Sequence, residues 1–358
     1  MPSTHQTSHG GRAVTRAAGE LLGVSAEALE LHHDAEIIDL HVDSFIWRRL
    51  LGYDFRRRHR AFTRGVMLSH FDLPRGREAG IDGAAWIITT NPLGDARDRE
   101  AAFFENLTEL SALLESPEAG ARVVRSAREY RAARAAGLHA AFVGVQGGNA
   151  LAYSLESIDR LAPGRIVLVT LLHLTSSRLG VTSSPLGGNA GLTSYGKDYV
   201  RRLNHHKILV DLAHVSRAGF WDAVHVHDRT LPLVVSHTGV AGVFDHWRNL
   251  DDAQLRAVAD SGGTVGIMYH SEYLGDPMFG GRLETVLRHI EHTIDVAGED
   301  HVSLGSDWDG SIVTPRDMQT CLELPRLTHA MLERGWSEAR IRKVLGLNFL
   351  RVVETLRG

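Results

Sequence analysis

Short apolar segments alternate with helical ones along the whole of this chain. The segments are rich in Val, Ile, Leu and Ala, and they predict strands at residues 36–41, 84–88, 140–145, 166–172, 208–212, 233–235, 263–268 and 301–304. Strands that alternate with helices are typical of parallel sheets. Eight repeats predict a (β/α)8 TIM-type barrel, an α/β fold. A doubly wound sheet is the alternative, but no glycine-rich phosphate loop follows the first strand.

The 358 residues exceed what a barrel needs. A barrel core takes about 250 residues, which leaves roughly 100 for an N-terminal arm and enlarged βα loops. We predict the arm at residues 1–30, with a disordered polar start and then a short helix capped by Ser25. Residues 31–358 contain no linker-like stretch, so they are predicted to form one barrel domain.

Charge and hydrophobicity exclude several classes of partner. The net charge of −4 does not indicate binding to nucleic acid or to an anionic membrane surface. No apolar run is long enough to span a bilayer, and the N-terminus lacks the apolar segment of a signal peptide. The single cysteine, Cys321, excludes an intrachain disulfide and fits a reducing compartment. We therefore expect a cytoplasmic protein.

An arginine-rich stretch interrupts this pattern. Arg48 and Arg49, followed by residues 56–60, lie in a predicted loop after the first strand. Such a loop is usually solvated or salt-bridged, and attraction of an anionic substrate is the alternative.

Residues of metal-ligating types lie at the ends of six predicted strands. They are His41, Asp43, Gln146, His173, His214, His237 and Asp307. The C-terminal ends of barrel strands meet on one face, where active sites lie. Imidazole and carboxylate ligands without cysteine suit Zn²⁺, and other divalent metals are the alternative. A metal lowers the pKa of bound water, and Asp307 is placed to accept that proton as a general base. Histidines within predicted helices, such as His227 and His289, are instead expected at the surface.

Several motifs, in this order and spacing, resemble the membrane dipeptidase (renal dipeptidase) family of zinc peptidases, within the amidohydrolase-type barrels. They lie at residues 39–43, 72–75, 144–148, 191–193, 210–216, 236–237, 248–250, 305–310 and 348–351. The resemblance covers about residues 37–351, most of the chain.

The resemblance implies a role for each matched residue. His41 and Asp43 would bind one Zn²⁺ and His214 and His237 a second, with the position of Gln146 bridging the two metals.

Three further residues would act on the substrate. His173 would contact the substrate and steady the tetrahedral intermediate, Arg248 would hold the terminal carboxylate, and Asp307 would handle the proton.

One departure from the family pattern concerns the metals. Gln146 replaces the bridging glutamate, and Asn149 stands where a histidine is usual. An amide offers one neutral oxygen where a carboxylate offers two anionic ones, so repulsion between two cations is less compensated. We hypothesise that the site holds one metal, or two weakly.

The function expected from the resemblance is metal-dependent hydrolysis of a dipeptide or similar small amide, with a D-residue on the C-terminal side as one option. Altered chemistry on the same scaffold (other amide or lactam opening, a lyase or an isomerase) is one alternative. A catalytically dead small-molecule-binding protein is another. Related barrels often pair, which adds a homodimer to the expected partners.

Overall fold

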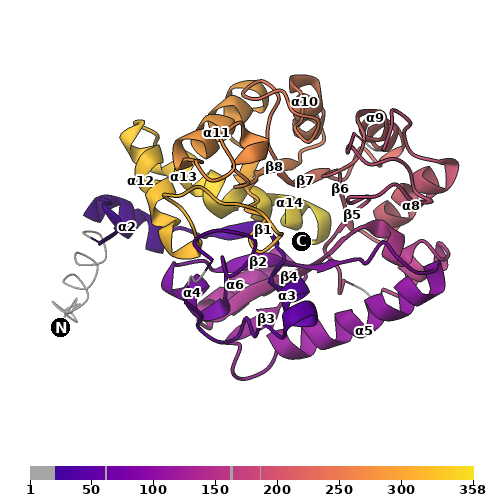
Figure 1. Cartoon of the computed structure of the whole chain (residues 1–358), viewed down its shortest axis with the longest axis horizontal. Coiled ribbons are helices and arrows are strands. Elements are labelled where there is room, and N and C mark those ends of the chain that lie inside the picture. The colour runs from indigo at the N-terminus through magenta and orange to yellow at the C-terminus, as the bar shows by residue number, and fades with distance from the viewer. Residues whose placement is uncertain (1–20, 61–62, 162–163, 186) are drawn as a thin grey trace, which may run out of the picture.

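The protein forms a closed parallel barrel surrounded by helices (Figure 1). A computed structural model describes residues 21–60, 63–161, 164–185 and 187–358. Strand β1 pairs with both β2 and β9, and a β2–β4 pairing closes the ring. The predicted (β/α)8 barrel is confirmed.

All eight predicted strands are present. They are β1 (Ile38–Val42), β2 (Gly83–Thr89), β4 (His139–Gln146), β5 (Leu168–Thr170), β6 (Leu209–Asp211), β7 (Val234–Thr238), β8 (Thr264–Ile267) and β9 (Val302–Leu304). A short additional strand, β3 (Ala121–Val123), was not predicted and pairs only with β4 at the margin of the barrel.

Helices fill most of the connections. They are α2 (Ala26–Asp34), α3 (Ser44–Leu51), α4 (Leu73–Glu78), α5 (Ala96–Leu114), α6 (Ala127–Ala135), α7 (Glu156–Asp159), α8 (Ser194–His205), α9 (Arg217–Val226), α10 (Asp252–Asp260), α11 (Leu283–Ala297), α12 (Pro325–Glu333), α13 (Glu338–Arg342) and α14 (Asn348–Arg357). Single turns of 3-10 helix lie at η1 (Gly148–Leu151), η2 (Glu272–Leu274) and η3 (Cys321–Glu323).

The structure corrects one expectation about local structure. Arg48 and Arg49 lie in helix α3 and not in a loop, because the chain turns into a helix directly after β1 and ends it at Gly52, which has a left-handed φ of 71°. Helix α12 begins at Pro325, which occupies the first helical turn, where its missing N–H costs nothing.

A π-helical turn, η4 (Lys343–Leu347), joins α13 to α14 beside the start of β1. A Cβ atom on Gly346 would lie 2.3 Å from the carbonyl oxygen of Glu36. The absent side chain thus allows the helix to pack directly against the strand.

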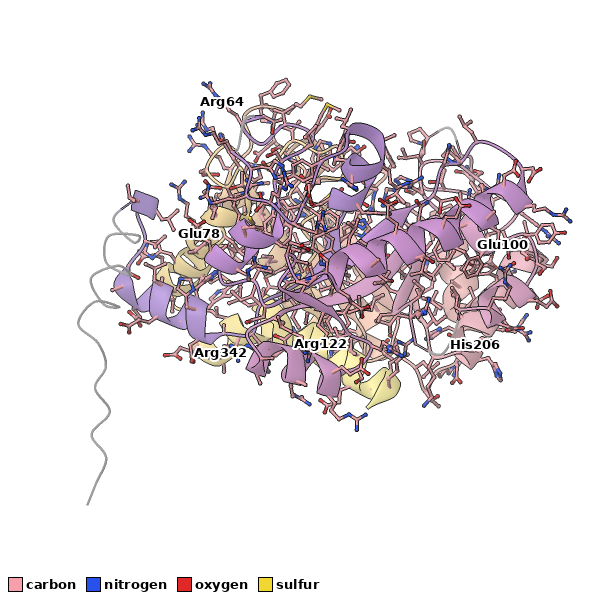
Figure 2. The ribbon with its side chains drawn as sticks, turned by 90° about the horizontal axis from the view of Figure 1, so that it is seen from below. Arg64, Glu78, Glu100, Arg122, His206 and Arg342 are labelled. Carbon is pink, nitrogen blue, oxygen red and sulfur yellow. The ribbon has the colours of Figure 1, made fainter. Side chains whose placement is uncertain are left out.

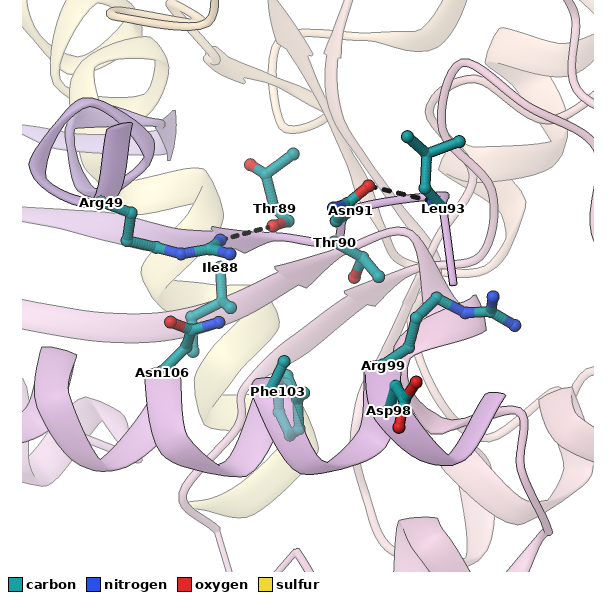
Figure 3. Close-up of a pocket in the computed structure, with 11 residues that line it drawn as sticks. Arg49, Ile88, Thr89, Thr90, Asn91, Leu93, Asp98, Arg99, Phe103 and Asn106 are labelled. Carbon is teal, nitrogen blue, oxygen red and sulfur yellow. Dashed lines mark hydrogen bonds between the residues drawn. The ribbon is translucent and has the colours of Figure 1, made fainter. Parts of the chain in front are cut away.

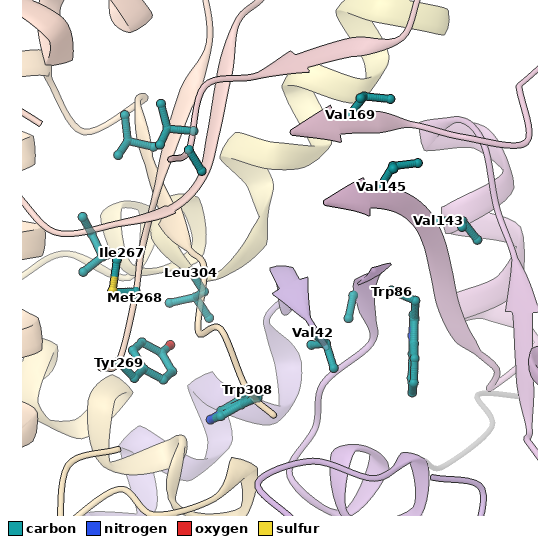
Figure 4. Close-up of a cluster of buried hydrophobic side chains, with 14 of the residues drawn as sticks. Val42, Trp86, Val143, Val145, Val169, Ile267, Met268, Tyr269, Leu304 and Trp308 are labelled. Carbon is teal, nitrogen blue, oxygen red and sulfur yellow. The ribbon is translucent and has the colours of Figure 1, made fainter. Parts of the chain in front are cut away.

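Buried side chains alternate along the strands, as the period of two requires. Within β4, Val143 and Val145 belong to one buried cluster, whereas Ala140 and Phe142 belong to a second cluster that includes α14. Aromatic rings occupy part of the first cluster (Figure 4), where the ring of Trp308 lies 5.6 Å from that of Tyr269.

The N-terminal arm is described only in part. Ser25 accepts a hydrogen bond from the backbone N–H of Ala28, so it caps α2 as predicted. The expected disorder of the first residues concerns a segment outside the described residues. None of the helices in the described ranges combines the length and hydrophobicity needed to cross a bilayer.

Charged side chains cover the outer helices (Figure 2). The arginine-rich segment between α3 and α4 forms ion pairs: Arg56 lies 2.9 Å and Arg57 lies 3.4 Å from Asp54, and Arg58 lies 3.1 Å from Glu78. The expected salt bridges are therefore confirmed for Arg56, Arg57 and Arg58.

Candidate metal centre

Residues from several strands converge at the C-terminal face of the barrel. His41 lies in β1 and Asp43 directly after it, and Gln146 ends β4. His237 lies within β7, while His214 and Asp307 follow the ends of β6 and β9. Parallel strands bring all of these positions to one edge of the barrel.

The first half of the centre contains His41, Asp43 and Asp307. The Nε2 atom of His41 lies 3.4 Å from Asp43 Oδ2 and 3.9 Å from Asp307 Oδ1. This nitrogen is buried and accepts or donates no hydrogen bond among the described residues. A buried ring nitrogen without a partner is costly unless another group binds it, so it fits a metal ligand.

Backbone contacts hold these ligands together. Asp307 N donates to the carbonyl oxygen of His41 (3.2 Å), and Asp43 N donates to that of Trp308 (2.8 Å). Asp43 occupies the N-cap position of α3, but its side chain caps no backbone N–H. Its Oδ1 atom instead accepts from Thr89 Oγ1 at 2.6 Å, which fixes the carboxylate beside His41.

The second half contains His214, His237 and Gln146. The Nε2 atoms of the two histidines lie 2.8 Å apart, and Gln146 Nε2 lies 3.3 Å and 3.4 Å from them. Burial lowers the pKa values of His214 and His237 well below the usual range, with a further contribution from the Arg248 charge. Both rings are therefore neutral at pH 7, the form in which imidazole binds metals.

His237 connects the two halves. Its ring centroid lies 3.8 Å from that of His41 and 4.9 Å from that of His214. One ligand atom from each of His41, His237 and Asp307 lies within 4.8 Å of the others. Two imidazole nitrogens and a carboxylate oxygen form a donor set that suits Zn²⁺ or another divalent ion.

A buried hydroxyl sets the tautomers of two ligands. Ser236 Oγ donates to Asp211 Oδ2 at 2.6 Å and lies 3.2 Å from His41 Nδ1 and 2.9 Å from His237 Nδ1. Because its hydrogen goes to the carboxylate, the oxygen accepts from both Nδ1–H groups. Both Nε2 atoms then carry the lone pair of their ring. The Nε2 atom of His41 has no partner among the described residues, whereas that of His237 lies 2.8 Å from His214 Nε2.

Asp307 and Arg248 provide the remaining charges. Burial raises the pKa of Asp307 to about 7. The nearby His41 lowers this pKa, and the like charge of Asp43 raises it further. Arg248 is 3% exposed and donates through Nη2 to the carbonyl oxygen of His237 at 2.7 Å. Its guanidinium forms no ion pair with any described residue, so its charge is available to an anion.

His173 lies beside the second half, with its ring centroid 4.8 Å from that of His214. Burial lowers its pKa to about 4, so it is neutral at pH 7. A neutral imidazole at this place can donate or accept one hydrogen bond with a bound molecule.

Backbone strain is concentrated at this face. His214 and Asp307 have left-handed φ angles of 63° and 62°, which are uncommon for residues with a Cβ atom. Such conformations persist where the surrounding structure enforces them, as at functional sites.

Three residues that position the ligands were not assigned to the site from the sequence. Thr89 and Asp211 end their strands, and Ser236 precedes His237. A carboxylate such as Asp211 inside an apolar strand is the signal that would have indicated a buried polar network.

A parallel barrel with imidazole and carboxylate side chains on its C-terminal face defines the class of metal-dependent hydrolase barrels. The sequence profile described as Membrane dipeptidase (Peptidase family M19) matches residues 25–357. The chain therefore belongs to this family.

Solved structures share the fold over most of their length. The dipeptidase AC, a metallopeptidase of family M19, is 26% identical with a TM-score of 0.79, covering 89% of this chain and 98% of that one. A metallopeptidase from Rhodobacter sphaeroides, liganded with a phosphinate mimic of the dipeptide L-Ala-D-Ala, is 26% identical with a TM-score of 0.77, covering 89% and 99%.

A curated relative matches a shorter region. An uncharacterised protein in the pqqA 5' region of Klebsiella pneumoniae is 38% identical over 169 residues, which are 46% of this chain. The matched region spans 61% of the length of that relative.

Proposed function

We propose that this chain hydrolyses the amide bond of a dipeptide or similar small amide with a metal-activated water. The observation that carries the proposal is the convergence of His41 Nε2, a His237 ring nitrogen and an Asp307 oxygen within 4.8 Å. A bound Zn²⁺ would lower the pKa of a water ligand and polarise the scissile carbonyl.

The side chains divide the remaining work. Asp307, whose pKa is raised toward neutrality, would accept the proton of the attacking water and pass it to the leaving amine. His173 would hydrogen-bond to the substrate, and Arg248 would bind its terminal carboxylate. His41, Asp43, His214 and His237 would hold metal, with Gln146 at the position between the two halves.

We further propose that the centre holds one metal tightly. Gln146 places a neutral amide nitrogen against both His214 and His237, so this side chain brings no negative charge to the position between the halves. A second cation would be repelled by the first without a bridging anion to offset it.

Two broader features complete the proposal. The single cysteine supports a cytoplasmic location, and pairing of two copies is the assembly expected of related barrels. A non-catalytic binding protein is the competing function, because Gln146 replaces the bridging carboxylate.

The test is hydrolysis of a dipeptide panel by purified protein, before and after chelation and after zinc is restored. We expect turnover that is lost on chelation and regained with zinc. Protein that binds zinc but cleaves no amide in the panel would contradict the hydrolase and favour the binding protein.

A further inference from the structure

Two separate cavities flank the metal centre. The first, here called the apolar pocket, measures about 360 Å³ and is lined by Ile46, Leu50, Pro92, Leu172, Leu174 and the ring of His173, among others. The second, the arginine pocket, measures about 240 Å³ and includes Arg248 and His214. His173 lines the apolar pocket and His214 lines the arginine pocket, and their ring centroids lie 4.8 Å apart. A bound molecule that reaches both cavities would therefore lie along these two rings, beside the second half of the centre.

The positions of the two cavities on the barrel rim determine which end of a bound substrate lies in each of them. The apolar pocket is formed by segments that follow β1, β2, β4 and β5, and the arginine pocket mainly by segments that follow β6 and β7. If Arg248 binds the carboxylate on the amine side of the scissile bond, the acyl side lies toward the apolar pocket.

The rim of the apolar pocket exposes large aliphatic side chains. Leu50 is 65% exposed and Leu174 is 60% exposed, yet both line the cavity. Covering such side chains with an apolar group removes surface from water at about 25 cal/mol per Å². Exposed leucines around a cavity therefore indicate an apolar ligand.

The charge of this region opposes a free ammonium group. Among the described residues, the lining of the apolar pocket contains the cation Arg49 and no carboxylate. Arg49 donates through Nη1 to the carbonyl oxygen of Thr89 at 3.0 Å. An adjoining cavity of about 170 Å³ shares Arg49 and adds Asp98 and Arg99 (Figure 3). Arg49 is the charged residue that the two cavities share, so a substrate ammonium directed into the apolar pocket would meet a cation and no carboxylate among the lining residues.

We propose that the chain acts preferentially on N-acyl amino acids with an uncharged, apolar acyl group, and less well on free dipeptides. This proposal deepens the proposed hydrolase function and depends on it. The water oxygen would bond to the acyl carbon while the C–N bond breaks. The products would be a carboxylate and a free amino acid, whose nitrogen takes up the proton.

The experiment compares pairs of compounds that differ only in the ammonium group. These are 4-methylpentanoyl-alanine against leucyl-alanine, and 3-phenylpropanoyl-alanine against phenylalanyl-alanine, each with L- and D-alanine. We expect kcat/KM to be at least about tenfold higher for the acyl compound of each pair. Equal values, or a preference for the dipeptides, would overturn the proposal.

A pair of variants tests the pocket itself. Leu50→Asp adds a carboxylate to the lining, and Leu51→Asp adds one at a neighbouring residue that is 67% exposed and does not line the pocket. We expect L50D to shift the preference toward the dipeptide by about tenfold and L51D to leave it unchanged. An equal shift in both variants would refute the assignment.

Failure of the hydrolase function can be distinguished from failure of this proposal. If zinc-loaded protein cleaves neither member of a pair, the proposed function is wrong. Binding of the same compounds, measured by calorimetry, then tests whether the apolar pocket prefers an uncharged acyl group. Tighter binding of the acyl compound than of the dipeptide supports this preference, and equal or weaker binding overturns it.

Discussion

The two halves of the metal centre carry the same kind of imidazole but different neighbours. His41 faces two carboxylates, Asp43 and Asp307, and its Nε2 atom has no hydrogen-bond partner among the described residues. His214 faces the amide of Gln146, and its Nε2 atom contacts that of His237 at 2.8 Å. The first half thus has anions and a free lone pair, and the second has neither.

One group of one side chain accounts for much of this difference, because Gln146 has an amide nitrogen where a glutamate would have a second carboxylate oxygen. A carboxylate at position 146 would supply charge to both halves, whereas the amide supplies a hydrogen-bond donor to the second half. The pKa of His41 reflects the same asymmetry. Burial would lower it, but the Asp43 and Asp307 carboxylates raise it overall. The protein therefore stabilises positive charge at the first half only.

The largest expected effect is a difference in metal content between variants of the two halves. His41→Ala removes a ligand from the half that has the carboxylates, so we expect loss of tightly bound metal and of activity to background. His214→Ala should leave the tightly held metal in place. Elemental analysis of both variants provides the measurement, and loss of metal from both would break the comparison.

Asp307→Asn should have the next largest effect. The amide cannot accept the proton of the attacking water, and we expect kcat to fall by about 10²- to 10⁴-fold. Steady-state kinetics on the preferred substrate would measure the change. A variant with near-normal kcat would show that another group moves the proton.

Substitution of Arg248 tests the carboxylate side of the substrate. Arg248→Lys loses the bidentate fork, so we expect kcat/KM to fall by about 100-fold, roughly 3 kcal/mol, for substrates with a free carboxylate. The same substrate with a C-terminal carboxamide serves as the control and should respond little. An equal loss of kcat/KM for both substrates would show that Arg248 stabilises the structure and does not bind the substrate carboxylate.

Ser236→Ala should have the smallest effect, on metal affinity. Without the hydroxyl, His41 Nδ1 and His237 Nδ1 lose the acceptor that fixes their tautomers, and we expect affinity to fall about 10- to 100-fold. Competition with a chromophoric chelator would measure it. Unchanged affinity would show that other contacts orient the rings.

The fold could be predicted because its signals are local. Short apolar runs and a helix cap such as Ser25 depend on neighbouring residues, and the structure confirms the predicted strands and this cap. The positions of His41 and Asp307 followed from one topological rule, that parallel strands end on a common face. These signals required no knowledge of distant contacts.

Other features could not be read from the sequence. His227 and His289 were expected at helix surfaces but are buried. A ring nitrogen of each forms a hydrogen bond with a backbone carbonyl outside its own helix: His227 with Leu231 O at 2.9 Å, and His289 with Leu274 O, in η2, at 3.1 Å. Periodicity places a residue on a helix face, but it does not show which loop later covers that face. The apolar pocket could not be predicted for the same reason, because its lining residues come from segments that follow four different strands.

Metal content per chain should be measured side by side for the natural sequence and for Gln146→Glu, after zinc loading and removal of loosely bound ions. We expect one zinc per chain for the natural sequence and two for the variant, since the added carboxylate supplies charge to both halves. Two tightly held metals in the natural sequence would contradict this expectation, because the neutral amide would then suffice to bridge them.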